Sequence, residues 1–159
     1  EGRSVMQDQI EREISKNLTG EMRETALKFT AFLKSHGLMF HRDRSGDWAE
    51  KIYYWARSDK NCVCFIAVKD PDEPENAWTV WSDAYEAPLG DAETSEIGLK
   101  YVNRCEKCGA CGGGRVKTVF GKRISGVCMC TFRVDNADLN GLPFLKTMVE
   151  LRLNEILQP

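Results

Sequence analysis

The chain has 159 residues, 42% of them hydrophobic, which predicts one globular domain able to bury its own core without disulfide cross-links. Its formal net charge of −2 argues against nucleic-acid binding by the chain as a whole. No apolar run approaches the roughly 18 residues of a membrane helix, and the charged N-terminal stretch lacks a signal-peptide core. We therefore expect a soluble, cytoplasmic protein without a membrane partner.

The N-terminal quarter has the apolar spacing of amphipathic helix. Apolar residues recur every three or four positions over 6–18 and again over 22–33, interrupted at Thr19 and Gly20. Gly37 then stands where a left-handed residue would end a helix. This pattern predicts two helices, or one bent helix, over residues 5–36.

Residues 38–85 have the composition of an antiparallel sheet. The β-rich runs "EKIYYWARS" and "NCVCFIAVK" flank a short polar turn, and "AWTVWSD" follows the acidic, proline-bearing stretch "DPDEPEN". These runs predict a meander of three strands. "LMFHRD" can add a strand at the edge, and "GKRISGVCMCTFRV" has the alternation of a further strand.

The C-terminal residues 138–157 return to helical spacing, with Pro143 suited to a first turn. Helices at both ends of an antiparallel sheet of three to five strands predict an α+β fold. We expect residues 1–159 to form a single domain, with residues 100–134 as a cysteine-rich, zinc-knuckle-like insertion that binds metal.

The stretch "CEKCGACGGG" carries the strongest chemical signal. Cys105, Cys108 and Cys111 form two overlapping C-x-x-C pairs, each followed by glycine, which lets the backbone turn tightly around a metal ion. Cys128 and Cys130 lie 17 and 19 positions beyond Cys111. We predict a structural zinc site made of Cys105, Cys108, Cys111 and Cys128. Cys130 is the reserve ligand, because residues two apart on a strand share a face.

The same cysteines also fit chemistry other than a zinc site. A C-x-x-C-x-x-C motif with a remote fourth cysteine is compatible with an iron–sulfur cluster, although no proline follows the remote cysteine and no second ligand set is present. A redox pair or packing cysteines are further alternatives. An iron–sulfur or thiol-dependent enzyme or redox protein, using Cys130 as a free thiol, is therefore the alternative function.

Basic residues surround this stretch, and Glu106 is the only acid between Lys100 and Arg123. A zinc-ribbon-like module with such a surface can bind nucleic acid. The simpler interpretation is that the cations balance the net negative charge of a Zn²⁺ ion bound by four thiolates. Given the acidic whole chain, we do not expect nucleic acid as a partner.

Large rings are dense in the predicted sheet, and all four tryptophans fall between Trp48 and Trp81. If helices cover one sheet face, the rings of the other face are available to a flat amphipathic molecule or a peptide. The alternative is that the rings only pack in the core. The candidate ligand-binding residues are Tyr53, Trp55, Trp78, Trp81 and Tyr85.

Two further cysteines, Cys62 and Cys64, alternate with apolar residues inside a predicted strand and are interpreted as packing residues. No catalytic motif is present, and His36 and His41 are the only histidines available to a general-base mechanism. We therefore predict a regulatory or sensor-like binding module with a structural zinc ion, and leave catalysis open.

Several segments together resemble a group of uncharacterised small proteins of anaerobic bacteria. The segments are "KFTAFLKSHGL", "YYWARSDKNCVCFIAV", "CEKCGAC", "VFGKRISGVCMCTFRVDNAD" and "LKTMVELRLNEI". The group has no established activity. The resemblance covers most of the chain and implies one domain with one metal site, in which Cys128 joins the three clustered cysteines.

Overall fold

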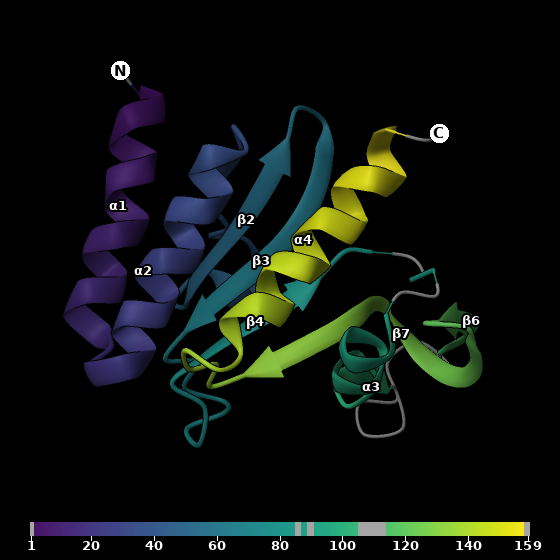
Figure 1. Ribbon diagram of the computed structural model, residues 1–159. Coiled ribbons are helices and arrows are strands. Elements are labelled where there is room, and N and C mark those ends of the chain that lie inside the picture. The colour runs from purple at the N-terminus through teal and green to yellow at the C-terminus, as the bar shows by residue number, and fades with distance from the viewer. Residues whose placement is uncertain (1, 85–86, 89–90, 105–113, 158–159) are drawn as a thin grey trace.

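The computed structural model describes residues 2–84, 87–88, 91–104 and 114–157, in which helices lie at both ends of an antiparallel sheet (Figure 1). The helices of these residues are α1 (Gly2–Asn17), α2 (Gly20–Ser35), the short 3₁₀ helix η1 (Gly46–Trp48), α3 (Ala92–Leu99) and α4 (Leu142–Leu157). The predicted α+β fold is confirmed. None of these helices has the length and apolar character needed to cross a membrane.

The sheet has seven strands among the described residues, and each strand pairs antiparallel with its neighbours. The strands are β1 (Met39–Arg42), β2 (Ile52–Ser58), β3 (Asn61–Val68), β4 (Trp78–Ser82), β5 (Val102–Arg104), β6 (Arg115–Val119) and β7 (Lys122–Asp135). Strands β1 to β4 form the predicted meander. The order continues through β7 to β5, and β6 pairs with the first half of β7.

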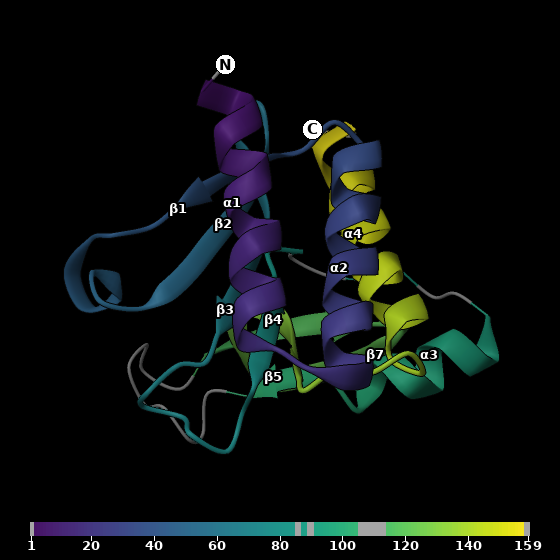
Figure 2. The same cartoon turned by 90° about the vertical axis from the view of Figure 1, so that its left-hand side faces the viewer.

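Helices α1, α2 and α4 lie on the same face of the sheet, as Figure 2 shows from the side. Every second residue along each strand points to this face, and these residues form the core together with the apolar sides of the helices. Trp78 on β4, for example, is 1% exposed, and its ring lies 6.4 Å from that of Phe29 on α2. We call the opposite side of the sheet the far face.

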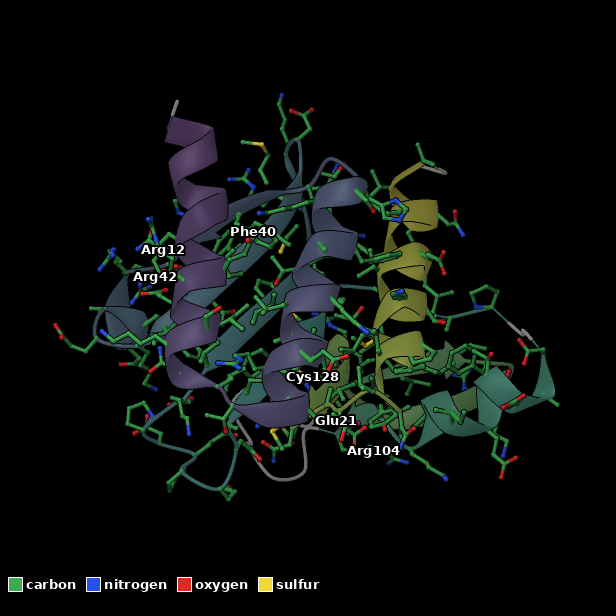
Figure 3. All side chains as sticks on the ribbon, turned by 60° about the vertical axis from the view of Figure 1, so that its left-hand side comes forward. Arg12, Glu21, Phe40, Arg42, Arg104 and Cys128 are labelled. Carbon is green, nitrogen blue, oxygen red and sulfur yellow. The ribbon has the colours of Figure 1, made fainter. Side chains whose placement is uncertain are left out.

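A buried polar contact joins α1 to the first two strands. Arg42 at the end of β1 donates to Glu13 on α1 at 2.6 Å, and the Tyr54 hydroxyl on β2 donates to the other oxygen of the same carboxylate. Figure 3 shows Arg42 beside α1. Because a buried charge is costly without a partner, this contact fixes the position of α1 on the sheet.

The structure extends the sequence prediction in the region 88–120. Helix α3 and the short strands β5 and β6 are not evident from the sequence pattern. Three to five residues are too few to show a periodicity, and α3 has only eight residues. The sheet consequently has more strands than the predicted three to five. The N-terminal helical region divides at Leu18 and Thr19 into two helices, which decides between the two predicted alternatives.

Candidate functional site

A row of directly paired residues crosses five neighbouring strands of the far face. His41 on β1 pairs with Trp55 on β2, Trp55 with Phe65 on β3, and Phe65 with Trp81 on β4. Trp81 in turn pairs with Arg133 on β7. We call these five residues the cross-strand row. Because directly paired side chains point to the same side of a sheet, the row forms a continuous strip.

The rings of the row remain in contact with solvent. His41 is exposed, and Trp55, Phe65 and Trp81 are only partly buried. The Trp55 ring centroid lies 6.0 Å from those of His41 and Phe65, in edge-to-face orientation. No helix of the described ranges lies over this strip except η1, so it provides an aromatic surface of the kind found in ligand and partner sites.

Helix η1, in the β1–β2 connection, adds one ring to this surface. Trp48 at its end stacks on Tyr53, with 3.8 Å between the ring centroids, and meets Trp81 edge-to-face at 6.3 Å. Tyr53 is consequently only 8% exposed. Its burial raises the pKa of the phenol above the ordinary value. Trp48 therefore covers Tyr53 and separates the Tyr53 ring from solvent.

Asp43 is largely buried and provides a negative charge beside Trp55. Its carboxylate accepts hydrogen bonds from the Ser45 hydroxyl at 2.5 Å, the Ser45 backbone N–H at 2.8 Å and the Trp55 indole N–H at 3.1 Å. These bonds, the Ser45 hydroxyl foremost, hold the pKa of Asp43 below its ordinary value, and His41 adds a smaller effect in the same direction. Asp43 is therefore ionised at neutral pH.

The other end of the row opens into a cleft of about 600 Å³. Arg133 and Asp135 on β7 contribute to its lining, together with Glu73 and Asn76 from the β3–β4 loop and residues 100–104 on the opposite side. Arg133 is held by ion pairs with Glu73 and with Asp135, the latter at 3.0 Å. The cleft thus extends the aromatic strip with a polar, charged surface.

The predicted ligand-binding residues divide between the two faces. Tyr53, Trp55 and Trp81 lie together on the far face, whereas Trp78 points to the helices and donates its indole N–H to the Ala137 carbonyl. Trp78 therefore does not share a surface with the other three. Tyr85 lies outside the described residues.

Sequence reasoning does not select Asp43 and Arg133, although both border the aromatic surface. Their positions follow from strand register, which places Arg133 across from Trp81 and the end of β1 beside Trp55. A period-two alternation in "FRVD" indicates that Arg133 and Phe132 point to opposite faces. It cannot indicate which strand lies next to Arg133.

Of the five cysteines considered as metal ligands, the structure describes two. Cys105, Cys108 and Cys111 lie outside the described residues. Cys128 and Cys130 lie on β7 and are both partly buried. The described ranges contain no group of three or more histidine, cysteine or acidic side chains arranged to hold a metal ion.

The residues that flank the segment 105–113 are described. Arg104, the last residue of β5, and Arg115, the first of β6, both pair with Val127 from opposite edges of β7. Gly114 approaches β7 so closely that a Cβ there would lie 2.8 Å from the Val127 carbonyl oxygen. Cys128 is the next residue along β7, and Figure 3 shows it with Arg104 in the lower part of the view. The described residues on both sides of this segment, Arg104 and Arg115, therefore lie beside the strand position that precedes Cys128.

Lys117 is not part of a basic surface. It is 1% exposed, and its ammonium group donates to the Met129 carbonyl at 3.1 Å and to the Thr131 hydroxyl at 2.8 Å. Burial lowers the pKa of this amine. The other described basic residues of this stretch are exposed: Lys100, Arg104, Arg115, Lys122 and Arg123.

Burial raises the pKa of the described thiols of β3 and of Cys130 on β7. Cys64 is 1% exposed and belongs to the core, as predicted, and Cys62 is partly buried. Burial raises the pKa of Cys62 to about 12. Burial, and next the neighbouring Cys128, raise the pKa of Cys130 to about 12. Since the thiolate is the reactive form, Cys62 does not have the properties of an activated nucleophile.

Comparison of the chain with known protein families, with curated proteins and with solved structures found no match. The resemblance to small cysteine-rich bacterial proteins stays a prediction. Fold and site define an α+β domain with an aromatic cluster on one sheet face.

Proposed function

We propose that this chain is a binding module whose far face holds a flat amphipathic molecule or a peptide. The cross-strand row carries the proposal. It presents three partly exposed aromatic side chains side by side, between the exposed His41 and the ion-paired Arg133. Rings with polar edges fit ligands that are both flat and amphipathic. The adjoining cleft gives such a ligand room for polar groups.

Titration with N-phenylnaphthylamine, a flat and uncharged probe that fluoresces in apolar sites, tests this proposal. We expect saturable binding, a change in tryptophan emission and a melting temperature that rises with probe concentration. Trp55→Thr should weaken probe binding by about fivefold, as expected for losing one aromatic contact. Ile97→Thr, which changes an exposed apolar residue of α3, is the matched control and should bind normally. If both variants bind the probe equally well, the far face is not the binding site.

We also propose that a structural zinc ion anchors the segment after β5, bound by Cys105, Cys108, Cys111 and Cys128. The support is the pairing of Arg104 and Arg115 with Val127, because the described residues that flank the cysteine-rich segment then lie next to the position before Cys128. Cys128 is closer to this junction along β7 than Cys130. Four thiolates fill the tetrahedral positions that Zn²⁺ prefers in structural sites.

Elemental analysis of the purified chain tests the metal proposal. We expect about one zinc per chain, lost in Cys128→Ser and retained in Cys130→Ser. Because zinc binding contributes on the order of 10 kcal/mol to folding in small zinc domains, Cys128→Ser should also be much less stable than Cys62→Ser. If anaerobically prepared protein contains iron and absorbs visible light, the site holds an iron–sulfur cluster and not zinc. If Cys128→Ser retains the metal and Cys130→Ser loses it, Cys130 and not Cys128 is the fourth ligand.

A further inference from the structure

Two cationic side chains of the chain itself lie against tryptophans near the far face. The Lys51 ammonium lies 4.8 Å from the centroid of a Trp48 ring, and the Arg133 guanidinium lies 5.2 Å from that of Trp81. Each also forms ion pairs with carboxylates. Lys51 pairs with Asp70 at 3.3 Å and with Asp72 at 2.6 Å in the β3–β4 loop. Arg133 pairs with Glu73 of the same loop and with Asp135.

This arrangement of indole, cation and carboxylate therefore occurs twice on the surface. A cation over an indole is attracted by the negative charge of the ring face. A nearby carboxylate adds to that attraction, most strongly where water is partly excluded. The far face is thus already built to hold ammonium and guanidinium groups.

Trp55 is the third tryptophan of the far face, and it has the carboxylate without the cation. Its indole N–H donates to ionised Asp43 at 3.1 Å, which makes the ring more electron-rich. No lysine or arginine of the described ranges lies over this ring. Its ring neighbours are His41 and Phe65, which both meet it edge-to-face. Trp55 remains partly exposed.

The two loops that border the far face are acidic. Figure 2 shows the β1–β2 loop and the β3–β4 loop projecting on the side away from the helices. Their carboxylates exceed their cations: Asp43, Asp47, Glu50, Asp70, Asp72, Glu73 and Glu75 against Arg44, Lys51 and Lys69. This excess attracts a cationic partner and repels a polyanion such as nucleic acid.

We propose that Trp55, together with Asp43, binds an arginine or lysine side chain of a partner peptide that lies along the cross-strand row. The inference rests on the proposed binding function of the far face and adds the chemical class of the partner. The partner's cation takes the place over Trp55 that Lys51 takes over Trp48. The acidic loops and the aromatic strip together select a peptide that is cationic and in part apolar.

The test compares three capped octapeptides in which alanine alternates with arginine, with citrulline or with glutamate. Citrulline keeps the shape of arginine and removes its charge. Tryptophan fluorescence of the full chain, titrated at low ionic strength, should give affinity for the arginine peptide at least about tenfold higher than for the citrulline peptide. The glutamate peptide should bind more weakly than either.

Three variants test whether Asp43 and Trp55 cause the preference for arginine. Asp43→Asn should lower the affinity for the arginine peptide by about fivefold and leave that for the citrulline peptide unchanged. Glu96→Gln makes the same change in net charge on the exposed side of α3 and should bind both peptides like the wild type. Trp55→Leu keeps an apolar side chain and should lose the preference for arginine. Thermal melting of each variant establishes that it is folded.

Equal affinity for the arginine and citrulline peptides would overturn this inference. So would a preference for arginine that survives Trp55→Leu in a folded variant. If the chain binds N-phenylnaphthylamine but does not prefer the arginine peptide, the partner is not cationic. The proposed binding function would still hold in that case. If neither the peptides nor the uncharged probe bind, both proposals fail.

Discussion

Trp78 and Trp81 lie three residues apart on β4 and point to opposite faces of the sheet. Trp78 is packed against Phe29 under α2, whereas Trp81 lies on the far face with Arg133 over its ring. Two residues of the same type on one strand therefore have different roles. The first belongs to the core, and the second belongs to the proposed binding surface.

This difference predicts unequal costs of substitution. Trp78→Phe should lower the free energy of unfolding by about 2 kcal/mol, because it leaves a cavity and removes the donor to the Ala137 carbonyl. Trp81→Phe should cost less than about 1 kcal/mol, because the ring is partly exposed. Urea unfolding of both variants measures the difference. Equal losses would contradict the assignment of the two faces.

The contact between Glu13, Arg42 and Tyr54 should be worth more than a surface ion pair. The Arg42 side chain is 9% exposed, and its Nε has no hydrogen-bond partner among the described residues. Glu13→Ala removes the carboxylate that compensates this charge and should cost about 3 kcal/mol. The control Glu24→Ala breaks an exposed pair with Lys28 and should cost less than about 1 kcal/mol. Chemical denaturation compares them, and similar losses would show that Arg42 finds water or another partner.

Ser45→Ala should show a pH-dependent loss of stability. The Ser45 hydroxyl is the largest cause of the lowered pKa of Asp43. A carboxyl whose pKa is lower in the folded state stabilises the fold above its unfolded pKa, near 4, and loses this contribution as the pH falls through the folded value. Wild type and variant should therefore differ by about 1 kcal/mol at pH 7 and converge in acid.

The control for this pH dependence is Ser35→Ala. The Ser35 hydroxyl donates to the Phe32 carbonyl, which does not titrate. Its effect should be the same at every pH at which the chain is folded. Thermal unfolding over a pH series measures both variants, and a constant difference for Ser45→Ala would refute the role of Asp43.

Gly98 on α3 should not tolerate a methyl group. A Cβ at this position would lie 2.2 Å from Cε2 of Phe120 and 2.9 Å from Cε1 of Phe144. Gly98→Ala should therefore cost about 1–3 kcal/mol, despite the higher helix propensity of alanine. At Gly141 the nearest atoms are 3.5 Å from such a Cβ, so Gly141→Ala should change the melting temperature little. A higher melting temperature for Gly98→Ala would show that the two rings move aside.

The sequence alone determined the elements that are long and periodic. Helices α2 and α4, with 16 residues each, and strands β2 and β3, with seven and eight, are long enough for 3.6-residue and two-residue periods to be recognised. Strand β4 follows from its β-rich composition. The alternation along β3 marked Cys64 as a core residue. Cysteine spacing likewise selects ligand candidates without any tertiary information, because a metal site depends on residue type and local turns.

Only the tertiary structure decided which residues meet. The cross-strand row depends on the register of four strand pairings, and a shift of one residue in any of them would move its side chains to the other face. Trp78 and Trp81 are equivalent in composition, and the position of the helices separates them. Val127 lies between Arg104 and Arg115 because β5 and β6 pair with opposite edges of β7. Such long-range pairings depend on the packing of the whole sheet, which local sequence patterns do not encode.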